Sequence, residues 1–151
     1  MKGYWNKPDA TKESIVDGWF YSGDAGYFDT EGYLFIHDRV KDMIVSGGEN
    51  IYPAEVENAL MSHPEIADAA VIGVPDDKWG ESVKGFVVLQ PDSSLDETEI
   101  ISYTRTQIAG YKCPKTINFI EALPRNPSGK ILRRELREPF WEGKDRMVSG
   151  N

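Results

Sequence analysis

A single lysine stands at the tip of a constrained loop near the end of the chain. Lys130 follows two prolines and a glycine within residues 124–130. A lysine ammonium aimed at an oxyanion or a phosphate stabilises negative charge that develops in a reaction, most strongly where water is excluded. The loop is not a P-loop, because that motif requires glycine in place of Pro124 and Ser or Thr in place of Ile131. A solvated lysine ahead of a terminal helix is the simpler alternative.

Two further side chains have the chemistry to bind a nucleotide. Asp24 follows a glycine in a turn, where its carboxylate can accept hydrogen bonds from both hydroxyls of a ribose. Trp79 lies in a polar loop between two expected strands, and an exposed indole offers a stacking surface to an adenine ring. Each residue also has a structural explanation, because Asp24 could close an Asx-turn and Trp79 could cover the core. Neither establishes a nucleotide site by itself.

Two adjacent glycines lie in the middle of the chain, after a charged connector. The connector, residues 38–42, is too polar for a core strand, and a short β-branched pair follows it. Gly47 and Gly48 permit positive φ and allow another group to approach the backbone closely. Pro53 suits the first position of a helix. The pattern predicts a strand, a tight glycine turn and a helix; a surface linker leading into a hairpin is the simpler alternative.

The apolar pattern predicts the elements that position these side chains. Residues 1–37 are rich in aromatic residues, and a hairpin with its turn at residues 29–32 is expected there. The rest of the chain predicts an α+β fold, in which helices flank a three-stranded sheet. A capping box, with Ser94 as the N-cap and Glu97 three residues later, is expected to begin one helix. The expected helices are residues 53–61, 94–109 and 130–137, and the expected strands are residues 66–74, 83–89 and 117–120.

Composition excludes several classes of protein. The chain has 17 Lys and Arg against 25 Asp and Glu, a net charge of −8, which counts against a general nucleic-acid or anionic-membrane surface. The one cysteine, Cys113, excludes an internal disulfide and indicates a reducing compartment. No apolar stretch approaches the ~18 residues of a membrane span, and no signal-peptide core begins the chain. We expect a cytoplasmic protein without a metal site, since no Cys/His spacing suggests zinc.

Five segments taken together resemble the adenylate-forming acyl-CoA synthetases, most closely the fatty-acyl-CoA ligases. The resemblance runs in register from Met1 to about Leu136, and its segments are residues 19–24, 32–42, 46–53, 75–81 and 124–130. That family joins a large N-terminal domain to a small C-terminal lid. The resemblance assigns residues 1–37 to a remnant of the large AMP-binding domain, 38–42 to a hinge, 43–138 to the lid and 139–151 to a frayed tail.

The resemblance implies a role for the residues before the glycine turn. Asp24 would hold the ribose hydroxyls of ATP or AMP. Arg39 would contact the nucleotide or stabilise the contact between the domains. Lys41 would be the hinge on which the lid turns. Magnesium would be bound through the ATP phosphates by residues outside this chain.

The resemblance also implies a role for residues of the lid. Gly47 and Gly48 would line the tunnel for pantetheine, and Trp79 would flank the opening through which CoA enters. Tyr111 would lie near the nucleotide of CoA. Lys130 would bridge the carboxylate and the α-phosphate during adenylation.

The implied activity is ATP-dependent ligation of a carboxylic acid, expected to be a fatty acid, to CoA. The lid would rotate between the adenylation and thioester steps, and its partners would be the acid, CoA and the large domain. We expect no complete turnover from the chain alone. Cys113 stands where a basic or aliphatic residue is usual, which weakens a CoA phosphate contact there. A freestanding, non-catalytic module that binds a nucleotide or a partner, and a ligase with another acceptor, are the alternatives.

Overall fold

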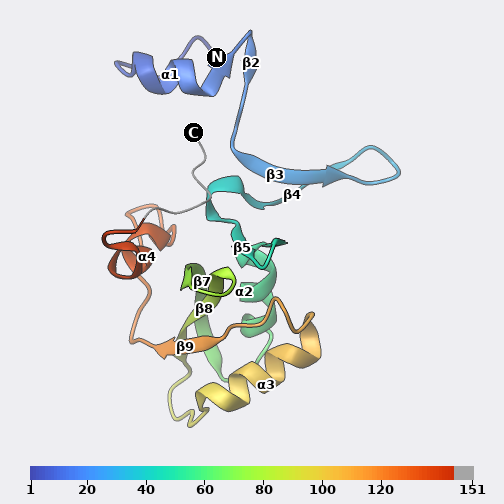
Figure 1. Cartoon of the computed structure of the whole chain (residues 1–151), viewed down its shortest axis with the longest axis vertical. Helices are drawn as coiled ribbons and strands as arrows, with labels where there is room; N and C mark the ends of the chain where they lie inside the picture. Colours follow the sequence, from blue (N-terminus) through green and yellow to red (C-terminus); the bar gives the residue numbers. More distant parts are fainter. Residues whose placement is uncertain (145–151) are drawn as a thin grey trace. The chain divides into compact units, whose positions relative to one another are not determined.

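The computed structural model describes residues 1–144 of the 151-residue chain. Contacts separate these residues into two units, Met1–Lys41 and residues 42–144. Figure 1 shows the elements of each unit. None of the described helices is long and apolar enough to cross a membrane, and residues 1–144 contain no cluster of three or more His, Cys, Asp or Glu that could hold a metal ion.

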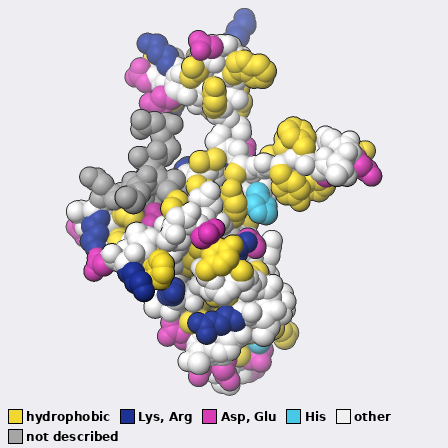
Figure 2. All heavy atoms as spheres, turned by 45° about the vertical axis from the view of Figure 1, so that its right-hand side comes forward, with side chains coloured by type: hydrophobic (Ala, Val, Ile, Leu, Met, Phe, Trp, Pro, Cys, Tyr) yellow, Lys and Arg dark blue, Asp and Glu magenta, His cyan; other side chains and the backbone are white. Residues whose placement is uncertain are grey.

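The first unit is a set of small antiparallel pairs without a buried side chain. Its elements are α1 (Pro8–Ser14), β1 (Ile15–Val16), β2 (Trp19–Phe20), β3 (Asp24–Phe28) and β4 (Leu34–Arg39). Strands β3 and β4 form the expected hairpin, and the Asp29 carboxylate accepts the N–H groups of Glu31 and Tyr33 at 2.9 and 2.8 Å in its turn. Figure 2 shows hydrophobic side chains gathered over this hairpin. As the sequence predicts, this unit has no core of its own.

The second unit confirms the α+β class. Its sheet is larger than the three strands expected, because five strands pair in the order β6-β5-β8-β7, with β9 parallel to β8. The strands are β5 (Ile44–Ser46), β6 (Glu49–Ile51), β7 (Ile66–Asp76), β8 (Gly80–Leu89) and β9 (Thr116–Phe119). The short strand expected before the glycine turn is β5, and it joins the sheet together with β6. Strands of three residues are too short for their apolar pattern to place them in a sheet.

Three helices complete the second unit: α2 (Pro53–Met61), α3 (Glu97–Gln107) and α4 (Arg133–Trp141). The expected capping box of α3 is wrong by two residues. The Asp96 carboxylate accepts the Glu99 N–H at 2.8 Å, and the Glu99 carboxylate accepts the Asp96 N–H at 3.0 Å. Glu97 is unavailable for such a box, because its carboxylate instead accepts the N–H of Ile117 in β9 at 2.7 Å.

The core lies on both faces of the sheet, because successive strand residues point to opposite sides. On one face, α2 and α3 pack against β7 and β8, with Leu60 and Ile100 buried among the strand residues. On the other face, Ile72 and Phe86 are covered by side chains of α4 and of the preceding loop. The sheet is therefore a middle layer, and α4 lies across it from α2 and α3.

Side chains cap the outer edge of β7, which ends the sheet. The Glu57 carboxylate accepts the Val71 N–H at 2.8 Å, and the Trp141 indole N–H donates to the Gly73 carbonyl at 2.9 Å. An exposed edge strand is a template for pairing with other chains, and covering it with side chains prevents this. The second cap comes from the far end of α4.

Helix α4 extends into the stretch expected to be a frayed tail. It continues through Pro139 to Trp141, because Phe140 packs edge-on against Phe86, with ring centroids 6.3 Å apart, and Trp141 is bonded to β7. Residues 145–151 of that expected tail lie outside the described residues.

Candidate functional site

A pocket in the first unit is lined by residues 20–24 and 39–41. We call it the first-unit pocket. It brings together three residues that sequence reasoning selected: Asp24, Arg39 and Lys41. They meet because Asp24 and Arg39 are opposite partners in the β3–β4 ladder, and the Val40 N–H donates to the Gly23 carbonyl at 2.9 Å.

The carboxylate of Asp24 is held in one orientation by a guanidinium. Arg39 Nε lies 2.8 Å from Asp24 Oδ1, and Arg39 Nη1 donates to the Ser22 carbonyl at 3.3 Å. The Asp24 side chain remains 28% exposed. A carboxylate has about four acceptor positions, so the guanidinium leaves capacity for the hydroxyls of a diol.

A second pocket, the second-unit pocket, lies where the glycine turn meets the β7–β8 loop. It has a volume of about 130 Å³ and is lined by Ser46, Gly47, Glu49, Trp79, Tyr111 and Lys115. Three of these, Gly47, Trp79 and Tyr111, are residues that the sequence singled out. Gly48 is not among the lining residues.

The absence of a side chain at Gly47 permits close packing against Trp79. A Cβ at Gly47 would lie 2.7 Å from Cε3 of the Trp79 ring, and the Gly47 N–H donates to the Trp79 carbonyl at 2.9 Å. Gly47 and Gly48 have φ of +61° and +86°, the left-handed region that a tight hairpin turn with two positive φ values requires. Only glycine meets both demands at position 47.

Trp79 is positioned by the turn that precedes it. The Asp76 carboxylate accepts the N–H groups of Lys78 and Trp79, both at 3.0 Å. These two backbone hydrogen bonds, that from Trp79 first, lower the pKa of Asp76 below its ordinary value. The Lys78 ammonium lies 4.6 Å from the centroid of the Trp79 ring, which is 42% exposed. The indole is therefore partly exposed at a fixed place.

The lysines beside Tyr111 have different environments. Lys112 Nζ contacts both carboxylate oxygens of Glu55 in α2, at 2.6 and 2.7 Å, and this hydrogen-bonded pairing raises the pKa of Lys112. Lys112 thus fastens the loop to α2, while Lys115 lines the second-unit pocket. Sequence reasoning missed Lys115, because nothing local distinguishes it from Lys112.

Cys113 is buried, and burial raises the pKa of its thiol. Its position therefore offers no phosphate contact.

The backbone around Lys130 is held by an asparagine. Asn126 Oδ1 accepts the Ser128 N–H, the Ser128 hydroxyl and the Lys130 N–H at 3.0, 2.8 and 2.9 Å. The Asn126 N–H in turn donates to the Lys130 carbonyl at 2.9 Å. Gly129 adopts a φ of +81°, which closes the turn.

An arginine anchors the same loop to the sheet. Arg125 Nη1 donates to the Gly129 carbonyl and Arg125 Nη2 pairs with Asp68 of β7, each at 2.6 Å. The loop therefore has a fixed backbone with an exposed lysine side chain at its tip. Lys130 is not among the residues that line the two pockets described above.

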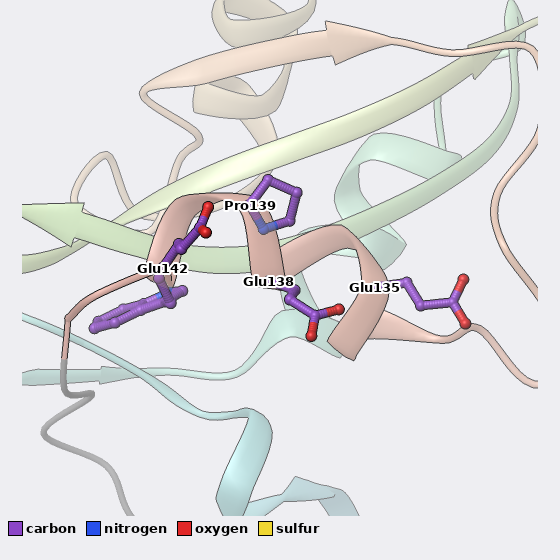
Figure 3. Close-up of a pocket in the computed structure, with 5 residues that line it drawn as sticks. Glu135, Glu138, Pro139 and Glu142 are labelled. Carbon is purple, nitrogen blue, oxygen red and sulfur yellow. The ribbon is translucent and has the colours of Figure 1, made fainter.

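A hollow on α4 is a poor candidate for the same chemistry. It is lined by Glu135, Glu138, Pro139, Trp141 and Glu142, and Figure 3 shows Glu135 and Glu138 extending from the helix. Its three carboxylates would repel a phosphate or a carboxylate substrate. It contains none of the residues that sequence reasoning selected.

The fold is that of the small C-terminal domain of the adenylate-forming enzymes. The chain belongs to the AMP-binding enzyme C-terminal domain family, whose model matches residues 55–130.

Similarity extends beyond that range. The chain is 51% identical over 149 residues to the fatty acid–[acyl-carrier-protein] ligase ScoC of Streptomyces coeruleorubidus, covering 99% of this chain and 29% of the relative. It is 54% identical over 140 residues to a feruloyl-CoA synthase of an Amycolatopsis species, covering 93% of this chain and 28% of the relative. A solved structure of a Mycobacterium tuberculosis fatty acyl CoA synthetase is 49% identical, with a TM-score of 0.69, over 95% of this chain and 28% of that one.

The chain spans less than a third of the length of each of these proteins. The relatives are ligases for acids of different kinds, one with a carrier protein as acceptor and one with CoA. An acid–thiol ligase is the class that they share.

Proposed function

We propose that this chain is the C-terminal part of a longer ATP-dependent ligase that joins a carboxylic acid to CoA. The observation that carries the proposal is the close contact of Gly47 with Trp79 beside Tyr111. Gly47 contributes bare backbone to the lining of the second-unit pocket, beside the partly exposed rings of Trp79 and Tyr111. Such a lining suits a thin pantetheine arm, and the rings suit the base at its end. In this proposal residues 1–37 belong to the large domain, 38–42 to the hinge and 43–138 to the lid.

The first-unit pocket is the proposed nucleotide contact. Asp24 accepts the ribose hydroxyls of ATP or AMP, and Arg39 holds that carboxylate in place while adding positive charge near the phosphates. Magnesium, bound through the ATP phosphates by residues outside this chain, supplies further charge neutralisation.

Lys130 serves the first step. The acid's carboxylate oxygen bonds to the α-phosphorus while the bond to the β-phosphate oxygen breaks, giving an acyl-adenylate and pyrophosphate. Negative charge gathers on the α-phosphate oxygens during this exchange, and the Lys130 ammonium neutralises it. The Asn126 and Arg125 contacts keep the lysine backbone in place, so little reorganisation is needed.

The glycine turn serves the second step. Rotation about Lys41 withdraws Lys130 and presents Gly47 and Gly48 to the acyl-adenylate. The CoA thiolate attacks the acyl carbon, the carbon–oxygen bond to the phosphate breaks, and AMP leaves. Lys115 and Tyr111 at the rim of the second-unit pocket receive the nucleotide end of CoA, with Lys115 attracting a phosphate.

The acid is proposed to be a fatty acid and the acceptor to be CoA. Two of the relatives described above are named for fatty acids or fatty acyl groups, although a third is named for a feruloyl group. The aromatic rings and Lys115 of the second-unit pocket, which Glu49 also lines, favour CoA over a carrier protein, since a carrier-bound pantetheine lacks the adenine nucleotide. A competition between CoA and acyl-carrier protein for the same acyl-adenylate decides the acceptor.

Separate measurement of the two half-reactions in the longer protein tests the mechanism. Lys130→Ala should abolish pyrophosphate release with ATP and acid but still convert synthetic acyl-AMP to acyl-CoA. Lys41→Pro should still release pyrophosphate but lose thioester formation, because proline fixes φ and restricts Val40 before it. Lys144→Ala, a change at an exposed lysine, is the control and should alter neither.

Equal loss of both half-reactions in both variants would show that the lid does not alternate about Lys41. The 151-residue chain alone should release no pyrophosphate, since the proposal places the remaining phosphate-binding groups elsewhere. Pyrophosphate release by the chain alone would overturn that assignment.

A further inference from the structure

We propose that Arg137 is a positioning residue that fastens α4, and with it the Lys130 loop, to the residue directly after the proposed pivot. The inference rests on the proposed function for its consequence in catalysis, while its structural basis lies wholly within the second unit. Arg137 Nη2 lies 3.0 Å from Asp42 Oδ1 across 95 positions of sequence. Asp42 is the first residue of the second unit and directly follows Lys41.

Asp42 is buried and Arg137 is largely shielded from solvent, and one nitrogen of Arg137 lacks a partner. The Arg137 and Asp42 side chains are 16% and 12% exposed. Arg137 Nε is buried and makes no hydrogen bond within residues 1–144. Removing two charges from water costs several kcal/mol per ion, and apolar residues of similar volume often replace such a pair without loss of stability. The pair is therefore expected to add little to the free energy of unfolding, and its main effect is to fix the position of α4 relative to Asp42.

A second arginine fixes the start of α4, the helix that follows the Lys130 loop. Arg133 contacts both carboxylate oxygens of Glu57, at 2.9 and 2.6 Å through Nη2. Arg133 and Arg137 are four residues apart and so lie on one face of α4. The helix is thus fixed to α2 at one point and to the end of the connector at another.

The two anchors have different consequences. Glu57 sits within the lid, so the Arg133 pair orients α4 on its own domain. Asp42 directly follows the proposed pivot Lys41, so a rotation about Lys41 moves Asp42 first. The Arg137–Asp42 pair then makes Asp42, α4 and the Lys130 loop move as one body. Without it, the loop keeps its Arg125 and Asn126 contacts, but Asp42 can shift relative to α4.

Hydrogen exchange on the 151-residue chain tests this directly. In Arg137→Met, amides of residues 40–46 should exchange at least about tenfold faster, while those of β7 and β8 keep their rates. Arg134→Met is the matched control, because Arg134 is an exposed arginine of the same helix, and it should change neither region. Arg137→Lys should restore part of the protection and the reversed pair, Asp42→Arg with Arg137→Asp, more of it.

Unchanged exchange at residues 40–46, or an equal increase through β7 and β8, overturns the proposal, because the pair would then do nothing local. If Arg137→Met does not fold, Asp42→Asn removes the same charge contact and carries the same criteria. In the longer protein, Arg137→Met should lower kcat for pyrophosphate release with the KM for ATP unchanged. A wild-type longer protein that releases no pyrophosphate contradicts the proposed function, while the exchange experiment still decides the role of Arg137.

Discussion

At the scale of single residues, substitutions at the two glycines of the β5–β6 turn distinguish backbone strain from a steric clash. Both lie at positive φ, so alanine at either should cost about 1–2 kcal/mol of unfolding free energy. Only at Gly47 would the added Cβ strike the Trp79 ring, since nothing lies within 4 Å of a Cβ at Gly48. Gly47→Ala should therefore also displace the indole, and a shifted Trp79 side-chain NMR signal would report it.

Gly48→Ala is the control for that experiment. It should lower the unfolding free energy by less than Gly47→Ala does, because it adds strain without a collision, and leave the Trp79 signal in place. Equal shifts of the signal in both variants would mean that turn strain alone moves the tryptophan, and that Gly47 has no special relation to the ring.

Two lysines with opposite pKa shifts are expected to affect stability differently between pH 7 and pH 10. Burial lowers the pKa of Lys84 below 10.5, against the opposing charge of Glu97, although its ammonium donates to Thr116 Oγ1 at 3.0 Å. The unfolded state then binds more protons between the two pKa values, so this group makes stability rise with pH in that window. Lys84→Met should flatten the rise, as urea unfolding from pH 7 to pH 10 would show.

Lys112→Met gives the contrasting result. Its pKa is raised above 10.5 by pairing with Glu55, so both states hold the proton throughout that range. The variant should lower the free energy of unfolding by roughly 1–3 kcal/mol. This loss should be about the same at every pH from 7 to 10. A loss that varied as strongly with pH as that of Lys84→Met would contradict the assignment.

Residues that share a pocket could be predicted only where they lie in a segment that resembles the family. Asp24, Arg39 and Lys41 lie in two such segments, and the structure places them together. Arg137 and Lys115 could not be predicted, because what sets each apart is a contact made by folding. No local pattern encodes a partner 95 positions away.

At the scale of elements, the cap of α3 is the clearest test of local chemistry. Asp96→Ala should lower the unfolding free energy by about 1 kcal/mol, because it removes the acceptor for the Glu99 N–H. Ser94→Ala should change it by less than about 0.5 kcal/mol, as expected for a surface substitution. Chemical denaturation of both variants checks the difference, and equal losses would contradict the observed cap.

Long elements were predicted with closer bounds than short ones, although the four-residue strand β9 was also expected. Helix α2 and strands β7 and β8 carry sustained apolar patterns, and their expected positions are confirmed. The α3 cap was misplaced because the segment around Ser94 contains two overlapping capping-box patterns. Which one forms depends on Glu97, whose carboxylate is used by β9 in the folded chain.

At the scale of the whole molecule, the two units differ in what holds them together. The second unit has a core on both faces of its sheet, whereas the first has no buried side chain and exposes the aromatic rings of its hairpin. Composition predicted this contrast, because the first 37 residues supply aromatic rings without a periodic apolar face. The proposed large domain would cover such a surface.

The two caps on the edge of β7 are made at different times during synthesis. Glu57 leaves the ribosome before Val71, whereas Trp141 follows Gly73 by 68 residues. At about 5–20 residues per second, the Gly73 carbonyl waits roughly 3–14 s for its indole. Trp141→Phe keeps α4 but removes the indole donor, so it would make that interval permanent and should form thioflavin-binding aggregates faster than the unaltered chain. A variant that stays soluble and monomeric would instead mean that Glu57 protects the nascent strand alone.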